Sequence, residues 1–192
     1  MKVYNNQFYH IFNRTNNHEA LFRTRDNYIF FLKKFKFYMI DACEVIAYCL
    51  MPTHFHFLLY INDELLFPVN FRKFLISYSK AFNKAYDRNG SLFQQNYKSI
   101  LIEKQEYLIN LATYIHQNPV RSKLVDKAYE WEFSSYLDYI DLRKGTLPNK
   151  KLILDNISIN DLKVITGDIQ WLPDIGSLKR RETSNGFQTL DL

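Results

Sequence analysis

The chain has 192 residues and a formal net charge of +5, and aromatic residues make up 17% of it. That length is enough to bury a substantial core in one domain, and the basic balance favours an anionic partner. No glycine precedes Gly90, so the first half lacks the glycine-rich loop of nucleotide hydrolases and dinucleotide-binding enzymes.

The sequence carries no sign of export. Its first residues lack the apolar core of a signal peptide, and no apolar run approaches the length of a membrane span. Cys43 and Cys49 would lie roughly 20 Å apart in one extended segment, too far for a disulfide bond. We therefore expect buried, reduced thiols in a cytoplasmic protein.

The first half of the chain alternates between strand and helix patterns. Residues 8–13 predict a strand, and a helix follows from about Arg25. Its apolar stripe recurs at i, i+3, i+4, i+7 and i+11, at Tyr28, Phe31, Leu32, Phe35 and Met39. Residues 44–50 are a β-prone run, and Pro52 and Thr53 form a turn into a third strand.

A second helix is expected up to Asn89–Gly90, with its apolar stripe at Phe71, Phe74, Leu75, Tyr78, Phe82 and Ala85. Residues 91–102 are predicted to be extended, and a third helix begins near Lys104. The order β-α-β-β-α-β-α predicts an α+β fold, a ferredoxin-like sandwich with one additional helix. Its two helices would cover one face of the sheet and leave the other face free for a ligand.

The C-terminal part has a different character. We place a catalytic domain at residues 1–142 and a more polar appendage of uncertain role at 143–192. Within the appendage, residues 160–165 predict a short helix ended by Gly167, and residues 184–192 predict a frayed end.

His54 and His56 are the most informative residues. At positions i and i+2 of a strand they project from the same face, about 7 Å apart, which suits two ligands of one divalent cation. A buried histidine without a ligand is the simpler reading of either residue alone. The His-x-His spacing also occurs in zinc hydrolases, so it does not specify the reaction.

The third helix supplies the groups that such a site lacks. Tyr114 and Asn118 lie one turn apart and face the same point. A tyrosine hydroxyl can attack a phosphodiester, and an amide oxygen suits a hard cation such as Mg²⁺ or Mn²⁺. Gln117 competes with Asn118 as a ligand, and Tyr107 competes with Tyr114 as the nucleophile. Asn118 also has a purely structural reading, as an N-cap before Pro119.

Basic residues concentrate between residues 67 and 104. Seven cations and two carboxylates there give +5, which equals the excess of the whole chain. A solvated helix face would explain this equally well. The candidate contacts with an anionic backbone are Arg14, Arg72, Lys73, Lys80, Lys84 and Arg88.

The chain resembles the single-tyrosine HUH transposases, in particular the branch of REP-associated tyrosine transposases. The matching stretches, in order, are NRTNNHEALF (13–22), AYCLMPTHFH (47–56), SLFQQNYK (91–98), YIHQNPVR (114–121) and WEFSSY (131–136). The family often has glycine where Thr15 stands and asparagine where Thr53 stands.

The resemblance implies roles for four residues. His54, His56 and Asn118 would hold the metal, and Tyr114 would form a 5′-phosphotyrosine with single-stranded or hairpin DNA from a palindromic repeat. The DNA would be cut and rejoined by a cytoplasmic, nucleoid-associated monomer or homodimer. Because the imidazoles must be neutral to bind metal, we expect activity to fade below about pH 6.5.

Two other classes of function remain open. A non-catalytic single-stranded nucleic-acid binding module would use the same sheet, basic helices and aromatic rings, but leaves the paired histidines without a purpose. A zinc-dependent hydrolase of a small molecule would need further ligands, and His10, His18 and His116 offer no obvious spacing for one.

Overall fold

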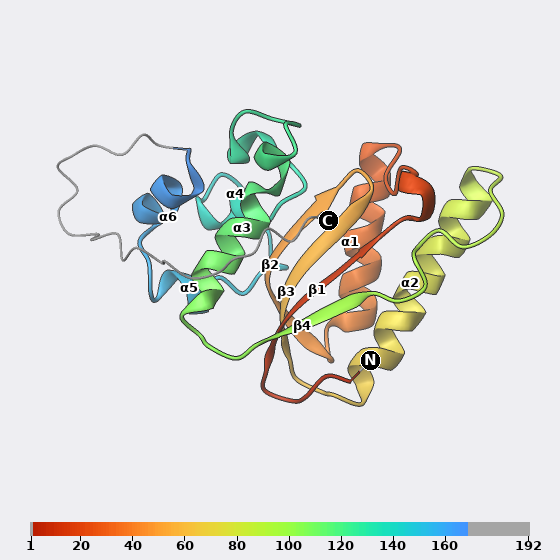
Figure 1. Cartoon of the computed structure of the whole chain (residues 1–192), viewed down its shortest axis with the longest axis horizontal. Helices are drawn as coiled ribbons and strands as arrows, with labels where there is room; N and C mark the ends of the chain where they lie inside the picture. Colours follow the sequence, from red (N-terminus) through yellow and green to blue (C-terminus); the bar gives the residue numbers. More distant parts are fainter. Residues whose placement is uncertain (1, 169–192) are drawn as a thin grey trace.

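A computed structural model of the chain describes residues 2–168. Its four strands form one antiparallel sheet in the order β2-β3-β1-β4. The strands are β1 (Phe8–Arg14), β2 (Cys43–Met51), β3 (His54–Ile61) and β4 (Lys98–Ile102). This order and the succession of helices confirm the predicted α+β sandwich (Figure 1). The predicted frayed end at 184–192 lies outside the described residues.

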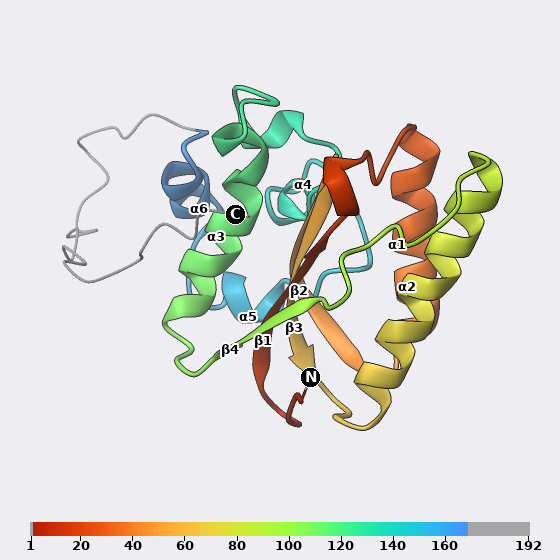
Figure 2. The same ribbon diagram turned by 45° about the vertical axis from the view of Figure 1, so that its right-hand side comes forward.

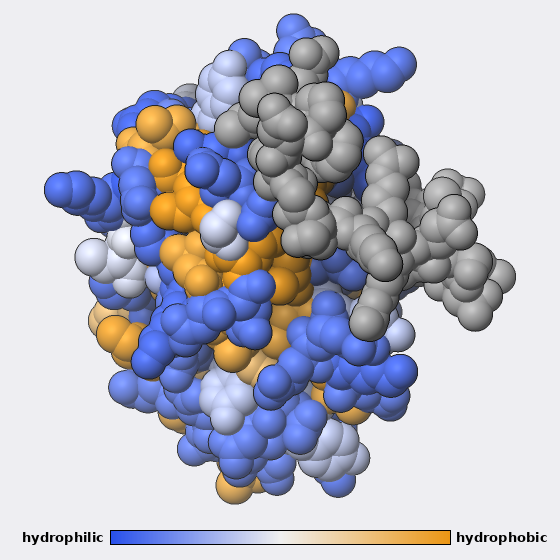
Figure 3. All heavy atoms as spheres, turned by 90° about the vertical axis from the view of Figure 1, so that its left-hand side faces the viewer, coloured by the Kyte–Doolittle hydropathy of each residue, from blue (hydrophilic) through white to orange (hydrophobic). Residues whose placement is uncertain are grey.

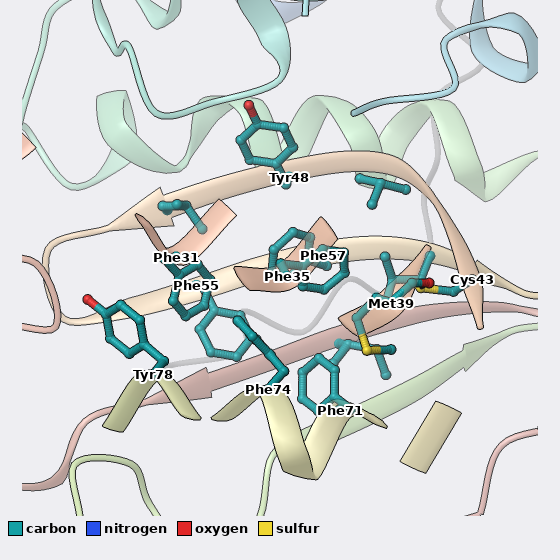
Figure 4. Close-up of a cluster of buried hydrophobic side chains, with 14 of the residues drawn as sticks. Phe31, Phe35, Met39, Cys43, Tyr48, Phe55, Phe57, Phe71, Phe74 and Tyr78 are labelled. Carbon is teal, nitrogen blue, oxygen red and sulfur yellow. The ribbon is translucent and has the colours of Figure 1, made fainter. Parts of the chain in front are cut away.

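Helices α1 (Arg25–Met39) and α2 (Leu66–Ala85) cover one face of the sheet. Phe55 and Phe57 point into this layer and are completely buried. The surrounding rings from the two helices are Phe31, Phe35, Phe71, Phe74 and Tyr78 (Figure 4). Many of them meet edge to face or stacked, an arrangement that adds to the stabilisation from burial alone. This layer explains the high aromatic content of the chain.

The second face of the sheet is partly covered. Helix α3 (Tyr107–Arg121) packs on β2, where Ile46 and Cys49, together with Leu58 of β3, contribute to a second core. The shorter elements of this layer are η2 (Ala128–Glu130), α4 (Tyr136–Tyr139), α5 (Lys151–Leu154) and α6 (Ile159–Thr166). The expectation of a wholly free face is therefore wrong, because α3 lies over part of it (Figure 2) and His10 and Phe12 of β1 are also buried there. The residues of β4 stay exposed or partly exposed.

The segment before β4 differs from its prediction. Only Lys98–Ile102 is strand, whereas the extended run was expected from residue 91. Leu92 and Phe93 are buried, but their carbonyls accept hydrogen bonds from the backbone and side chain of Asn16. Apart from a single antiparallel bridge between Thr15 and Phe93, these apolar residues anchor a loop to η1 (Asn16–His18) rather than extend the sheet.

Residues beyond 142 pack against the rest of the chain. Ile153 and Leu162 are buried beside α3, and Arg143 bonds the carboxylate of Asp138 and the carbonyl of Ser134. Gly167 ends α6 in the left-handed region, at φ 86°, as the sequence predicts. The domain boundary at 142 stays a prediction.

Figure 3 views the molecule from the side of α3 and α6, where hydrophobic residues reach the surface between polar ones. Cys43 and Cys49 are buried and unpaired. No helix within residues 2–168 combines the length and the hydropathy that crossing a bilayer requires.

Candidate active site

His54 and His56 begin β3 and project from the face opposite to Phe55 and Phe57, because side chains alternate along a strand. Their ring centroids lie 5.1 Å apart, with the planes at 89°. His56 is completely buried and His54 is partly buried. Arg14 pairs with His54 in the register of β1 and β3, so a positive charge stands beside the two imidazoles.

Both imidazoles use Nδ1 for a hydrogen bond. His54 Nδ1 lies 3.1 Å from Thr53 Oγ1, and His56 Nδ1 lies 3.0 Å from His10 Nε2. Nε2 of His56 is buried and has no hydrogen-bond partner within residues 2–168. A buried polar atom left without a partner costs about 1–3 kcal/mol, which a bound cation would offset. The histidine pair therefore fits a divalent cation held through Nε2.

The protein ligands for such a cation are few. Across residues 2–168 there is no group of three or more His, Cys, Asp or Glu side chains suited to a metal ion. Two imidazoles leave an open coordination sphere, in which an amide, water or substrate oxygen completes the set. Open positions are typical of catalytic rather than structural metal sites.

Burial keeps the imidazoles uncharged. Desolvation lowers the pKa of His54 to about 4, with a smaller contribution from Arg14, and holds the pKa of His56 well below its usual value. Desolvation also lowers the pKa of His10 to about 4. The expected loss of activity below about pH 6.5 assumed an ordinary histidine pKa. Because burial lowers the pKa of both imidazoles, we expect them to be protonated, and activity to be lost, at a more acidic pH.

Tyr114 lies on α3 next to the histidine pair. Its ring centroid is 6.4 Å from that of His56, with the planes at 83°. The guanidinium of Arg121 lies 5.1 Å from the Tyr114 ring centroid. The alternative nucleophile, Tyr107, stands two turns away at the start of α3 and is 41% exposed. Of the two tyrosines, it is Tyr114 that makes a ring contact with the pair.

Asn118 has a structural role within α3. Its Nδ2 donates to the carbonyls of Tyr114 (3.0 Å) and Ile115 (3.3 Å). Pro119 has no N–H for the Ile115 carbonyl, so the Asn118 amide supplies the missing donor. The helix continues to Arg121 with Pro119 inside it, so the N-cap interpretation is wrong. With the amide N–H groups used in this way, the Oδ1 atom remains to accept from, or bind to, a partner.

Gln117 faces a different part of the molecule. Its Nε2 donates to the carbonyls of Ile165 and Thr166, at 3.1 and 3.3 Å, and so ties α3 to the end of α6. The structure thus separates the two amides that the sequence left in competition, and favours Asn118 as the residue that shares the side of Tyr114.

A loop distant in sequence holds the turn before the histidines. The Pro52 carbonyl accepts from the Leu21 amide (2.7 Å), and the Thr53 carbonyl accepts from the Thr15 amide (2.9 Å) and hydroxyl (3.2 Å). Thr15 is extended, at φ −73°, so this position needs no glycine. The stretch 13–22 therefore fixes the start of β3.

The predicted DNA-binding residues separate into three groups. Arg14 lies on the face of the histidine pair. Arg72, Lys73, Lys80 and Lys84 are exposed on α2, which covers the opposite face of the sheet (Figure 2). Arg88 forms a two-pronged ion pair with Glu19, at 2.6 and 3.0 Å, and also bonds the Ser91 carbonyl. The charge of Arg88 is therefore balanced by Glu19 within the protein.

Two residues near the site were not predicted from the sequence. His10 contacts His56 because β1 pairs with β3, and this register is not visible in residue spacing. Arg121 follows Tyr114 by seven residues, so the helical repeat places both on one side. A search of the tyrosine's own helix stripe for cations would have found it.

Comparisons with known proteins identify the family and support the fold. The sequence model of the family described as "Transposase IS200 like" matches residues 3–118. A candidate REP-associated tyrosine transposase of Haemophilus influenzae is 26% identical over 129 residues, covering 59% of this chain and 73% of that protein. A solved REP-associated tyrosine transposase bound to a REP hairpin has a TM-score of 0.61 at 17% identity, over 73% of this chain and 82% of the other. At that identity the solved structure supports the fold, whereas the family match spans more than half of the sequence. The chain belongs to the IS200-like transposase family.

Proposed function

We propose that this protein cuts and rejoins single-stranded, hairpin-forming DNA through a covalent 5′-phosphotyrosine at Tyr114, with a divalent cation held by His54, His56 and Asn118. The observation that carries the proposal is the ring contact between Tyr114 and His56, 6.4 Å between centroids, in one chain. It brings a nucleophile next to two nitrogen ligands whose surroundings suit a cation. Because both come from the same chain, we propose that one copy carries out the reaction.

The proposed reaction exchanges one phosphodiester for another. The Tyr114 oxygen attacks the phosphorus and loses its proton to solvent, while the bond from phosphorus to the 3′ oxygen breaks and that oxygen leaves as a 3′-hydroxyl. A second 3′-hydroxyl then attacks the phosphotyrosine and releases the phenol. No high-energy cofactor is consumed, which agrees with a first half that contains no phosphate-binding glycine loop.

The side chains around Tyr114 have distinct tasks in this scheme. His54 and His56 would bind Mg²⁺ or Mn²⁺ through Nε2, with Asn118 contributing Oδ1. The cation, when bound, would polarise the scissile phosphate and orient it for in-line attack. Arg121, beside the Tyr114 ring, and Arg14, beside His54, would meet the charge of the incoming phosphate.

The path of the rest of the DNA follows from the charges. A groove of about 870 Å³ runs between α2 and the loop before β4, and Arg72 and Lys80 line it. The amides of Gln94 and Asn96 also line the groove and offer hydrogen bonds to unpaired bases. A strand that leaves the site across the edge of β4 would reach this groove on the other side of the sheet.

The class of DNA comes from the comparison. The solved relative is bound to a REP hairpin, and we extend that substrate class to this chain. A hairpin with a single-stranded foot would present both a shape to bind and a flexible phosphodiester for Tyr114. Its negative backbone complements the net charge of +5.

A denaturing gel tests the proposal. The protein is incubated with an end-labelled hairpin oligonucleotide and Mn²⁺, and we expect a protein–DNA adduct that chelation with EDTA prevents. Tyr114→Phe should abolish the adduct, whereas the matched variant Tyr107→Phe should retain it. An adduct that persists in Tyr114→Phe would disprove the assignment of the nucleophile. Tight binding without cleavage across a panel of repeat-derived hairpins would instead favour the non-catalytic binding module.

A further inference from the structure

We propose that His10 is a positioning residue for the metal site: it accepts a hydrogen bond from Nδ1 of His56 and so holds His56 in the tautomer whose Nε2 can bind a cation. This inference rests on the proposed metal role of the histidine pair. It adds to that role a third imidazole, which acts on the cation only through His56.

The contact between His10 and His56 is close and protected from water. The His10 Nε2 and His56 Nδ1 atoms lie 3.0 Å apart, and the ring centroids lie 5.2 Å apart with the planes at 23°. His10 is 4% exposed and His56 is 0% exposed. His10 sits on β1 within the same face as His56, two residue pairs away in the sheet register. The strands therefore hold both rings in place.

The chemistry of imidazole fixes the direction of this hydrogen bond. A neutral ring has one N–H donor and one bare nitrogen acceptor, so one of the two rings must donate to the other. If His10 donated, His56 would carry its proton on Nε2, and that nitrogen would have no lone pair for a cation. If His56 donates from Nδ1, its Nε2 is bare. Only the second arrangement agrees with a metal bound to His56.

The surroundings of Nε2 support the same direction. Within residues 2–168, His56 Nε2 is buried and has no hydrogen-bond partner. Nothing there accepts a proton from Nε2, whereas His10 is in place to accept one from Nδ1. The sheet therefore prepares the Nε2 lone pair before a cation arrives.

His54 is held in a matching way by a different group. Thr53 Oγ1 lies 3.1 Å from its Nδ1. When the Thr53 hydroxyl accepts from Nδ1 of His54, Nε2 of His54 likewise keeps its lone pair for the cation. Metal-bound histidines commonly donate their second nitrogen to a fixed acceptor, and loss of that acceptor typically lowers metal affinity 10- to 100-fold.

A pair of substitutions separates positioning from packing. His10→Phe keeps a flat ring of similar size but has no acceptor, and His10→Gln keeps an acceptor in its amide oxygen. Mn²⁺ binding to the free protein is measured by electron paramagnetic resonance of the unbound ion, in a Tyr114→Phe background. We expect His10→Phe to weaken Mn²⁺ binding about 10- to 100-fold and His10→Gln to restore most of it. Substitution of the exposed His18 by Gln should leave the affinity unchanged.

The tautomer itself is visible without metal. Long-range proton–nitrogen spectra of the ¹⁵N-labelled imidazoles should assign the proton of His56 to Nδ1 in the wild type and in His10→Gln. This measurement decides the case if His10→Phe fails to fold. A proton found on Nε2 of His56 overturns the inference, as does equal Mn²⁺ affinity in folded His10→Phe and wild type. If the wild type itself shows no Mn²⁺ binding that depends on His54, the proposed metal site is wrong as well.

Discussion

His116 predicts a steep dependence of stability on pH. It is completely buried, its Nε2 lies 2.8 Å from Ser135 Oγ, and desolvation lowers its pKa to about 3. In the unfolded chain the same side chain titrates near its ordinary value of about 6.5. Between these two values the unfolded chain binds a proton that the folded chain does not. Stability is therefore lost progressively as the pH falls from about 6.5 towards the folded pKa.

The size of the effect follows from the two pKa values. From pH 7 to pH 5 the unfolded state gains about 2 kcal/mol of proton-binding free energy at His116, and the folded state gains almost none. His10, with a pKa lowered to about 4 by the same cause, adds about 2 kcal/mol more. Domains of this kind have total stabilities of about 5–15 kcal/mol, so the sum is a large fraction of the whole.

Urea unfolding at pH 7 and pH 5 measures the effect. Wild type should lose stability over this range, and His116→Gln should lose about 2 kcal/mol less than wild type over the same range. The matched control is His18→Gln, at an exposed position, which should lose as much as wild type. Ion pairs shared by all three proteins cancel in the comparison. Equal losses in wild type and His116→Gln would refute the assignment of a neutral buried imidazole.

Two further substitutions test the site and its surroundings. Asn118→Ala removes both the donor to the Ile115 carbonyl and the ligand oxygen, so it should lower the unfolding free energy by about 1–3 kcal/mol and also weaken Mn²⁺ binding. Asn118→Asp keeps a ligand oxygen and should lower the unfolding free energy alone. Calorimetry that finds Mn²⁺ affinity unchanged in Asn118→Ala would remove Asn118 from the ligand set. Arg88→Met should destabilise the fold, because it removes the two-pronged ion pair with Glu19 and one of the donors to each of the Gly90 and Ser91 carbonyls. In contrast, Lys80→Met should leave stability within about 0.5 kcal/mol and reduce the slope of log affinity for hairpin DNA against log salt by about one. Fluorescence anisotropy at several salt concentrations gives that slope, and a normal slope in Lys80→Met would place the DNA away from α2.

The sequence predicted the fold well where a periodic pattern of apolar residues has burial on one side as its only explanation. The helix stripe from Tyr28 to Met39 and the alternation around His54 each follow from burial on one side, and the structure reproduces both. The loop at residues 91–97 was misjudged because burial of Leu92 and Phe93 has the same sequence signature in a strand and in an anchored loop. Side-chain hydrogen bonds from Asn16, far away in sequence, decide between the two.

The sequence of β2 already indicates that the second face of the sheet is partly covered. Residues 45–51 are buried without interruption, and a strand that is apolar at every position is buried on both faces. The expected open face is therefore restricted to the edge of the sheet at β4, whose residues are exposed or partly exposed. The sequence does not indicate that the cations of α2 lie on the opposite side of the sheet from the histidine pair. An amphipathic pattern shows which side of a helix faces the core, but not which face of the sheet the helix covers.

The hydrogen bonds from Thr15 and Leu21 to the turn at Pro52 and Thr53 have a consequence for protein engineering. The geometry of the two imidazoles is encoded in two separate stretches of sequence, which must be compatible with each other. Grafting the hairpin at 47–56 from a relative into this chain would import the histidines without the segment that clamps them. We expect such a graft to keep the geometry of the two imidazoles only if residues 13–22 of the same relative are exchanged together with the hairpin.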